Sequence, residues 1–505
     1  MKGGAVAAGS HLTVEAGLRA LRAGGNAVDA AVACHFMASV AEPLLTGLGG
    51  GGMAMVRMEG QVQTCDLFAN IPGLDDAQGA SLDMDEVTID FGPTTQRFLV
   101  GCGAAAVPGV PAGICALHGR FAQLTLPDLA ASAIQAAQEG VEVLPGFERV
   151  CGLLWPILRR SEAMRCSLGR NGRPLRAGET YLAPDLARTL QEFAEAGEGY
   201  FRDGAGARAL CRFLDGRSHV GPTDLLHQEA RFTPALELQY RGARVWVPGP
   251  PSAAGFAVVR MLQALESREA ENSPAGPEAV AAIAQAQARI DGFRTPAFFH
   301  DLFTDGFAAR LQAGMRAGQG IQAVGPGLTT HISTVDEQGG AVSITHSLGE
   351  TCGEMVDGTG MLVNNFLGEA DVNPPSLDRP AGSRLVTMCC PTILERGDDV
   401  FALGSGGSSR IPTAVLHGTV YLVDHRLTAA EAVAGPRAHL EGGRLHVESD
   451  GRTEATMAKV AASHPDLIRF DGPNMFFGGL HMVGIEDGRF TGVGDHRRSG
   501  AYGTV

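Results

Sequence analysis

Two adjacent threonines, Thr329 and Thr330, lie far from either end of the sequence, at the start of a segment with the pattern of a β-strand. The stretch before them, Gly325-Pro326-Gly327-Leu328, favours a turn, whereas Thr330 to Val335 alternates as a half-buried strand does. Cleavage between Leu328 and Thr329 would give a threonine whose own α-amine activates its hydroxyl, which is one way of strengthening a weak nucleophile. We therefore predict a nucleophile at Thr329. The alternative is that Thr329 only begins a strand.

A predicted β-hairpin brings a second hydroxyl toward Thr329. Thr330 to Val335 and Ala341 to Ser347 both alternate, and the glycine-containing residues 336–340 between them favour a turn. If this turn centres on Gln338, Ser347 lies opposite Thr329 and within reach of its hydroxyl or α-amine. A slip of one residue would remove this pairing, and the alternative is that Ser347 is an ordinary hydroxyl at a strand end.

A second glycine cluster, Gly404 to Arg410, follows the strand-like Val400 to Leu403 and precedes a helical pattern from Pro412. Backbone N–H groups converge at a turn of this kind, which is how an oxyanion hole is made. A serine nucleophile at Ser405 or Ser408 is an alternative, but neither serine lies in the G-x-S-x-G pattern of a nucleophile elbow.

The elements before these segments are predicted to be largely helical. Apolar residues recur at helical spacing over Thr13 to Ala23, and Asn26 is placed to cap a second helix, Ala27 to Val40, which is apolar nearly all round and therefore belongs inside a layered structure. Residues 105–300 also show mainly helical patterns.

A glycine run, residues 47–52, matches the letters of a dinucleotide-binding loop, G-x-G-x-x-G. Such a loop needs a strand before it and a helix after it, whereas here a helix precedes and Met53 to Met58 reads as a strand. We therefore predict no nucleotide site. Beyond residue 329, short strands dominate, with Gly360 to Val363 expected to be a further one. Strand-rich portions with helices outside them predict stacked sheets in a layered α/β fold.

Composition excludes several classes of protein. The 505 residues include 45% hydrophobic and 19% charged residues, which describes a globular chain, and the net charge of -15 argues against nucleic acid or an anionic membrane surface as the main partner. The ten cysteines show no C-x-x-C pair and no zinc-ligand spacing, so they are expected to be mostly reduced and buried, with no metal or other cofactor. Without a signal-peptide pattern at the start, the cytoplasm is the expected location. His331 is expected to be structural.

Several motifs together resemble the γ-glutamyltranspeptidase family of N-terminal nucleophile hydrolases, over nearly the whole chain. The motifs are Gly24-Gly25-Asn26-Ala27-Val28-Asp29-Ala30-Ala31, Gly49 to Gly52, Val107-Pro108-Gly109, Pro250-Pro251-Ser252, Thr329-Thr330-His331, Gly360-Met361-Leu362-Val363-Asn364-Asn365 and Gly404 to Ile411.

The resemblance implies a precursor that cleaves itself between Leu328 and Thr329. Fragments 1–328 and 329–505 would then stay together as one intertwined domain, a four-layer αββα sandwich. It also implies that Thr329 is both nucleophile and α-amine base, that Ser347 supports it in a position where the family usually has threonine, and that the backbone N–H groups of Gly407 and Ser408 form the oxyanion hole.

The positions that bind substrate in the family differ in this chain. An arginine that holds the α-carboxylate of a γ-glutamyl group aligns with Phe68, and a phenyl ring cannot replace a bidentate arginine. An expected asparagine is Gly349, a glutamine or glutamate is Phe366, and the aspartate that binds the α-amine is Glu369. The paired serines align with Thr387 and Met388. The stretch from Glu369 to Arg384 is about ten residues shorter than in relatives with a lid loop, which favours a more open pocket.

We therefore expect a self-processed hydrolase or acyltransferase that cleaves an amide-type bond of a small-molecule substrate through an acyl-threonine, mainly with water as acceptor. Its activity on ordinary γ-glutamyl compounds is expected to be weak or absent. The alternatives are a γ-glutamyl enzyme acting on glutathione or polyglutamate, a biosynthetic enzyme that cleaves an activated carbon–carbon bond beside a carbonyl, and a non-catalytic scaffold.

Overall fold

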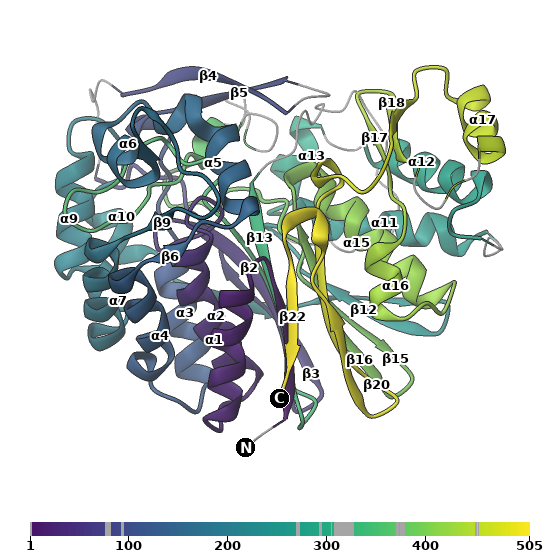
Figure 1. Ribbon diagram of the computed structural model, residues 1–505, viewed down its shortest axis with the longest axis horizontal. Coiled ribbons are helices and arrows are strands. Elements are labelled where there is room, and N and C mark those ends of the chain that lie inside the picture. Colours follow the sequence, from purple (N-terminus) through teal and green to yellow (C-terminus); the bar gives the residue numbers. More distant parts are fainter. Residues whose placement is uncertain are drawn as a thin grey trace.

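The structure, a computed structural model, describes residues 3–75, 82–91, 95–268, 273–291, 295–304, 306–307, 328–369, 373, 379–449, 452 and 454–505. Two large β-sheets stand side by side at the centre, and helices lie on the outer side of each (Figure 1). The fold is thus a mixed arrangement of helix and sheet, as predicted. The predicted turn at residues 325–327 and most of the segment expected to be short, residues 370–378, lie outside the described residues.

The first sheet joins strands from both sides of residue 329. The hairpin predicted around Thr329 lies at its centre, flanked by strands from the beginning of the chain. Its seven strands are, in spatial order, β10 (Arg231–Pro234), β3 (Gln61–Leu67), β2 (Gly51–Met58), β14 (Ala341–Ser347), β13 (Thr329–Asp336), β1 (Gly4–Ala8) and β22 (Ala501–Thr504).

The second sheet carries the other glycine cluster. It has six strands in the order β11 (Leu236–Tyr240), β12 (Ala243–Val247), β15 (Thr392–Arg396), β16 (Asp399–Gly406), β20 (Gly479–Glu486) and β21 (Arg489–Val493). β16 is paired on both sides, with β15 and with β20, so the turn that follows it is held from two directions.

Small apolar and polar side chains fill the space between the sheets. Ser343 donates a hydrogen bond of 2.9 Å to the Leu403 carbonyl, and Ser333 donates one of 3.3 Å to the His481 carbonyl. Because these hydroxyls bond to backbone oxygens of the facing sheet, they fix the position of β13 and β14 relative to β16 and β20.

Helix α2 (Ala27–Ala41) is buried at every position, as its all-round apolar pattern predicts. Asn26 caps it through a capping box, also as predicted. Asp336, at the end of β13, accepts a hydrogen bond of 2.9 Å from the Ala27 N–H, and Thr334 donates one of 2.7 Å to the Ala27 carbonyl. These bonds attach the start of the helix to the strand that begins with Thr329.

Other helices cover the outer sides of the two sheets. Beside α2 lie α1 (His11–Arg22), α3 (Val110–Phe121), α4 (Leu126–Glu139), α5 (Pro145–Leu158) and α7 (Pro184–Ala196); on the second sheet lie α11 (Ala253–Glu266), α12 (Pro277–Asp291), α15 (Ile411–Val423) and α16 (Ala429–Ala434) (Figure 1). The remaining helices are α6 (Glu162–Leu168), α8 (Gly199–Arg202), α9 (Ala205–Leu214), α10 (Pro222–His227), α13 (Pro296–Asp301) and α17 (Glu454–Ser463).

In the described part of the chain, four smaller sheets, one of three strands and three of two strands, lie outside the two large ones. They comprise β17 (Ala438–Glu441), β18 (Arg444–Glu448) and β19 (Ile468–Phe470); β4 (Asp85–Asp90) and β5 (Thr95–Val100); β6 (Val141–Glu142) and β9 (Thr180–Tyr181); and β7 (Gly169–Arg170) and β8 (Arg173–Pro174). Within the described ranges, no helix combines the length and apolar character needed to cross a bilayer.

One prediction about these elements is wrong. Gly360 to Val363 is not a strand, because only Leu362 forms an isolated bridge, with Met355; Val363 instead accepts hydrogen bonds from the loop around Thr351. Residues 105–300 are mainly helical, as predicted, although β10, β11 and β12 lie among these helices and extend the two large sheets at one side. These short edge strands carry too little periodic pattern to be separated from the helices around them.

Candidate active site

The hairpin places Thr329 opposite Ser347, in the register that the sequence predicts. The Thr329 hydroxyl lies 3.4 Å from the Ser347 hydroxyl, and both residues are about 6% exposed. The register follows from the turn at residues 337–340, whose Gly339 has a positive φ of 79°. Two hydroxyls thus meet at the end of the central hairpin, where the backbone is fixed by strands on either side.

A cavity with about 340 Å³ of open space surrounds this pair of hydroxyls. It brings together residues that are far apart in the sequence, including most of the predicted site positions. Its walls are formed by Phe68, Leu328, Thr329, Ser347, Phe366, Glu369, Thr387, Met388, Cys389, Ser408 and Ile411. Two predicted site residues, Gly349 and Gly407, are outside this set. Gly349 donates a hydrogen bond to the lining residue Ser347, and Gly407 directly precedes the lining residue Ser408.

Ser347 also contacts the peptide bond that was predicted to break. Its hydroxyl donates a hydrogen bond of 2.7 Å to the Leu328 carbonyl and accepts one of 2.9 Å from the Gly349 N–H. The Leu328 N–H lies 3.4 Å from a carboxylate oxygen of Glu350, a residue 1% exposed. The carbonyl of the bond between Leu328 and Thr329 is therefore held by a hydroxyl, and the preceding N–H, that of Leu328 itself, is held by a carboxylate.

The turn after β16 lies against the backbone of Thr329. A Cβ added to Gly406 would come within 2.0 Å of the Thr329 carbonyl oxygen, so only glycine permits this approach. Gly407 and Ser408 both have positive φ, 127° and 47°. In the described part of the chain no hydrogen bond uses the backbone N–H of either residue. This turn therefore has two N–H groups available close to Thr329, and an oxyanion hole would need such groups.

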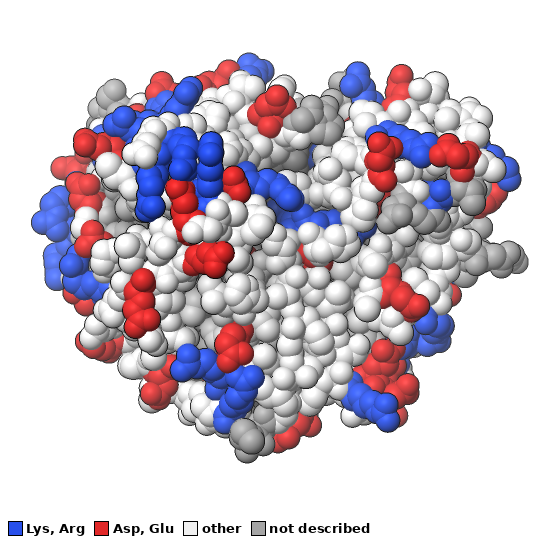
Figure 2. Space-filling view, viewed as in Figure 1, with Lys and Arg blue, Asp and Glu red and all other residues white. Residues whose placement is uncertain are grey.

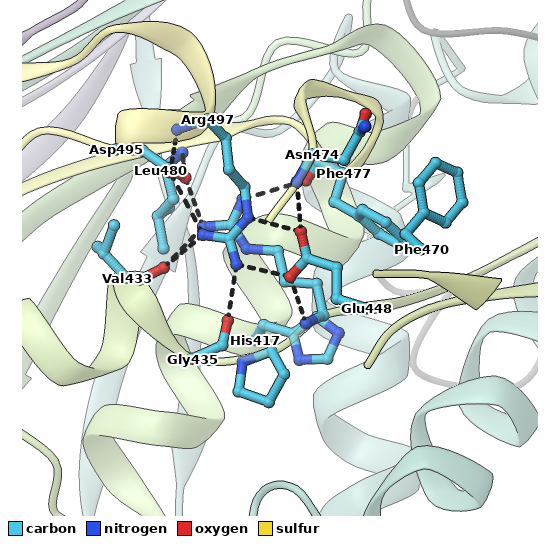
Figure 3. Close-up of polar contacts among 12 residues, drawn as sticks. His417, Val433, Gly435, Glu448, Phe470, Asn474, Phe477, Leu480, Asp495 and Arg497 are labelled. Atoms are coloured by element: carbon cyan, nitrogen blue, oxygen red, sulfur yellow. Dashed lines mark hydrogen bonds and ion pairs between the residues drawn. The ribbon is translucent and has the colours of Figure 1, made fainter. Parts of the chain in front are cut away.

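A buried network of charged residues holds β20, the strand next to β16 (Figure 3). Arg497 makes two hydrogen bonds to the Glu448 carboxylate, of 2.7 and 2.6 Å, and Arg437 contacts Asp495 at 2.6 Å. Asp495 accepts a hydrogen bond of 2.9 Å from the N–H of Leu480 in β20, the strand that pairs with β16. Burial alone would raise the pKa of Asp495, but Arg437 and Arg497 hold it at about 2.

One wall of the cavity is formed by two buried phenyl rings. Phe68 and Phe366 have ring centroids 4.7 Å apart with a tilt of 38°. Asn364 fixes Phe366 in place, because its side chain donates to the carbonyls of Gly49 and Ala106 at 2.8 and 2.9 Å. The predicted substrate-binding positions Phe68 and Phe366 thus form a single apolar wall.

Burial keeps the histidines near the centre of the fold neutral. His331 contacts the hydroxyls of Thr345 and Ser333 at 2.8 Å each and does not line the cavity, in keeping with the structural role expected for it. Burial lowers the pKa of His346 to about 4 and that of His481 to about 4, and it lowers the pKa of His35 and His331 well below the usual value.

Because the pKa values of these histidines are lowered, we expect the folded state to lose stability in mild acid. Below pH 6.5 the unfolded chain binds protons at such histidines, whereas the folded chain does not. Their contribution to the free energy of unfolding is therefore intact above pH 6.5 and is lost as the pH falls toward 4. For His346 the expected loss between pH 7 and pH 5 is about 2 kcal/mol. Urea unfolding at several pH values measures it.

The matched variant is His346→Phe, which keeps a ring beside His35, at a centroid distance of 4.9 Å in the wild type, and removes one titrating group. It should reduce the pH dependence of the unfolding free energy by close to one proton. An unchanged dependence would contradict the assignment of His346 as a buried neutral group.

No group of three or more His, Cys, Asp or Glu side chains that could hold a metal ion occurs among the residues that the structure describes. The cysteines there are all free, and most of them are buried, as predicted. Cys389 lines the cavity, but burial raises its pKa to about 12, so its thiol is not a competing nucleophile.

Sequence reasoning missed three contributors to this site. Glu350 follows closely after Ser347, but nothing in its local pattern indicates a contact with Leu328. Cys389 and Ile411 complete the cavity from segments that pack together only in three dimensions.

A larger cavity, with about 620 Å³ of open space, lies elsewhere, between Glu42, α5 and Arg498.

Comparison with known proteins finds relatives over nearly the whole chain. The chain is 30% identical over 526 aligned residues to the acylase ACY 1 proenzyme of Pseudomonas sp. (strain SE83), covering 98% of this chain and 92% of the relative. It is 28% identical to the glutathione hydrolase proenzyme of Pseudomonas sp. (strain A14), covering 98% and 93%. The fold is similar to that of cephalosporin acylase from Bacillus halodurans, with a TM-score of 0.83 at 23% identity and coverage of 99% and 96%.

These relatives are hydrolases, and the family profile described as gamma-glutamyltranspeptidase matches residues 13–505. The resemblance seen in the motifs is thereby confirmed. The chain belongs to the γ-glutamyltranspeptidase family, as a hydrolase or acyltransferase of the N-terminal nucleophile type.

Proposed function

We propose that this protein is a self-cleaving precursor of an amide hydrolase whose nucleophile is Thr329. The observation that carries the proposal is the position of Ser347, whose hydroxyl lies 3.4 Å from the Thr329 hydroxyl and donates 2.7 Å to the Leu328 carbonyl. The names of the relatives, which are proenzymes, support a precursor. The two central sheets with helices outside them support the four-layer αββα arrangement predicted from the sequence.

Self-cleavage would begin with attack of the Thr329 hydroxyl oxygen on the Leu328 carbonyl carbon. Ser347 polarises that carbonyl by hydrogen bonding to its oxygen. The peptide C–N bond then breaks and its nitrogen takes up the proton lost by the hydroxyl, which leaves an ester between Leu328 and the Thr329 side chain. Water hydrolyses the ester and releases fragments 1–328 and 329–505, the second with a free α-amine at Thr329.

In turnover the same hydroxyl would attack the carbonyl carbon of an amide substrate while the α-amine accepts its proton. The negative charge that develops on the carbonyl oxygen would be stabilised by the N–H groups of Gly407 and Ser408. The protonated amine then returns the proton to the leaving nitrogen, and water resolves the acyl-threonine to carboxylic acid and free Thr329.

Intact-protein mass spectrometry tests this proposal. We expect two species with the masses of residues 1–328 and 329–505, and an acyl adduct only on the smaller fragment after exposure to a reactive amide or ester. A chain that stays whole on prolonged incubation would contradict the proposal and favour a non-catalytic scaffold.

The cavity also predicts poor activity on γ-glutamyl compounds. None of its described lining residues is a lysine, arginine or histidine, so the α-carboxylate of a γ-glutamyl group would be buried unpaired, which costs about 2 to 5 kcal/mol. Turnover of γ-glutamyl-p-nitroanilide should be about 30-fold or more below that of an uncharged acyl anilide of similar length, an estimate that follows from this penalty. Robust γ-glutamyl transfer would contradict it.

A further inference from the structure

The larger of the two cavities, with about 620 Å³ of open space, is separate from the one that contains Thr329. It lies between the start of α5 and the residues that precede β22 (Figure 1). Most of its wall is apolar and is formed by Leu44, Leu45, Leu144, Phe147 and Val150. A mostly apolar cavity of this size with a few charged groups is typical of a site for a small organic ligand.

The charged residues around this larger cavity are mainly arginines. Among its described lining residues, Arg149, Arg497 and Arg498 are basic, and Glu42 is the single acid. Figure 2, drawn from the same side as Figure 1, shows Lys and Arg side chains gathered where α5 approaches β22. This surplus of positive side chains favours an anion over a cation as the ligand.

Arg149 is the cation that is placed to bind such an anion. It is exposed on α5 at the edge of the cavity, and within the described ranges its side chain takes part in no ion pair or hydrogen bond. A guanidinium presents a planar set of N–H donors that matches a carboxylate. Because the adjacent wall is apolar, the matching ligand has a carboxylate at one end and an apolar body at the other.

Glu42 is already bonded within the protein. Its carboxyl group accepts hydrogen bonds of 2.8 Å from the Thr13 hydroxyl and 2.6 Å from the Thr330 hydroxyl. Burial raises the pKa of Glu42, which favours its neutral form and weakens its repulsion of a nearby anion. Glu42 also connects the larger cavity to the candidate nucleophile, because Thr330 directly follows Thr329 on β13.

Arg498 connects the same cavity to the glycine turn after β16. One of its terminal nitrogens lies 3.3 Å from the position that a Cβ at Gly407 would take, and the other lies 3.5 Å from that of Gly406. Burial lowers the pKa of Arg498 to about 10, so this side chain is still a cation at neutral pH. The larger cavity therefore borders both elements that meet at Thr329, the start of β13 and the glycine turn.

We propose that the larger cavity is a second ligand site, which binds a small apolar carboxylic acid and thereby slows amide cleavage at Thr329. Arg149 binds the carboxylate, and Phe147 and Val150 pack against the apolar body. Negative charge develops beside the glycine turn during attack, and an anion held close to that turn opposes it. The effect on turnover rests on the function proposed above, whose product is itself a carboxylic acid.

Three probes of similar shape test the binding: 4-phenylbutanoate, 4-phenylbutan-1-ol and 4-phenylbutylamine. Isothermal titration calorimetry should give a Kd for the acid at least about tenfold below those for the alcohol and the amine, as one charge-assisted contact provides. Thr329→Ala should bind the acid as the wild type does, because Thr329 does not line this cavity. An acid that binds no more tightly than the alcohol would overturn the inference.

Two variants locate the bound acid. Arg149→Gln should weaken binding of the acid at least about tenfold and leave binding of the alcohol unchanged, because only the charged contact is lost. Val150→Phe fills part of the cavity and should weaken both. The matched control is Arg159→Gln at the other end of α5, where the arginine is also exposed but lies outside this cavity. If Arg149→Gln leaves binding of the acid unchanged, the acid binds elsewhere and the inference is wrong.

Turnover of hexanoyl-p-nitroanilide tests the connection to Thr329. Saturating 4-phenylbutanoate should lower kcat at least about threefold with little change in KM, because the opposing charge acts on the transition state. Arg149→Gln should raise the acid concentration needed for this effect. Inhibition that only raises KM would place the acid in the cavity beside Thr329 and would contradict the second site.

Binding of the acid does not require self-cleavage, so calorimetry and a denaturing gel separate this inference from the proposed function. A chain that stays uncut and inactive but binds the acid through Arg149 contradicts the proposed function and supports the second site. A cleaved, active chain that does not bind the acid supports the proposed function and removes the second site. Binding through Arg149 without any loss of kcat would overturn the effect on turnover.

Discussion

Replacing Thr329 with alanine is expected to leave a single uncut chain of 505 residues and to abolish amide turnover. In the proposed mechanism the side-chain oxygen attacks the Leu328 carbonyl, and its removal leaves no group in position to replace it, since Cys389 is neutral and Ser347 already donates to that carbonyl. Loss of a nucleophile typically lowers the rate by about 10⁴-fold or more. A denaturing gel and a kinetic assay with hexanoyl-p-nitroanilide measure both effects.

Two further variants make this test specific to position 329. Thr329→Ser retains a hydroxyl and should still be cleaved, although more slowly. Thr330→Ser alters the adjacent threonine, whose hydroxyl donates to Glu42 on the other face of β13, and should be processed normally. Cleavage of the Thr329→Ala chain at the same bond would exclude Thr329 as the nucleophile.

Replacing Arg497 with methionine is expected to produce the largest loss of stability of any single change considered. Arg497 and Glu448 are both fully buried, and their two hydrogen bonds measure 2.7 and 2.6 Å (Figure 3). Removing the guanidinium leaves an uncompensated carboxylate in the interior, which costs about 3 to 5 kcal/mol. Urea unfolding followed by circular dichroism measures the change in midpoint.

The matched control is Arg469→Met at the protein surface. Arg469 also makes two hydrogen bonds to one carboxylate, that of Glu454, at 3.0 and 2.7 Å, but both side chains are exposed. An exposed pair of this kind contributes about 1 kcal/mol or less. Similar losses in the two variants would contradict the role of burial.

A double variant separates the charge effect from lost packing. In Arg497→Met/Glu448→Leu the Glu448 carboxylate is gone and Asp495 keeps Arg437 as its partner, so a substantial part of the lost stability should return. If the double variant is as unstable as the sum of the two single variants, the pair is not energetically coupled.

The local parts of the site could be predicted from the sequence. The hairpin from Thr329 to Ser347 is encoded by two alternating segments and the glycine turn between them, all within twenty residues, so its register can be read directly. The helix at Ala27 and its cap at Asn26 are likewise set by neighbouring residues. The prediction of a strand at Gly360 to Val363 was wrong because a short apolar run can form a buried loop as well as a strand.

The contacts that shape the substrate cavity could not be predicted in this way. Asp66 and Arg384 are more than 300 residues apart, as are Asn364 and Gly49. Their meeting depends on how the two sheets and their loops pack, and no local pattern records it. The family motifs indicated which positions line the cavity, but not which of the residues there contact one another.

The sequence by itself determined the fold class, the family and the position of the candidate nucleophile, because periodicity, turns and ordered motifs are properties of neighbouring residues. It also showed that Phe68, Gly349 and Glu369 depart from the family pattern. Only the tertiary structure decided what these residues contact. Phe68 packs on Phe366, Arg384 contacts Asp66, and a Cβ at Gly349 would lie 2.6 Å from a carboxylate oxygen of Glu369. The reason is physical: charge complementarity and packing depend on distances between side chains, which are fixed only when the chain has folded.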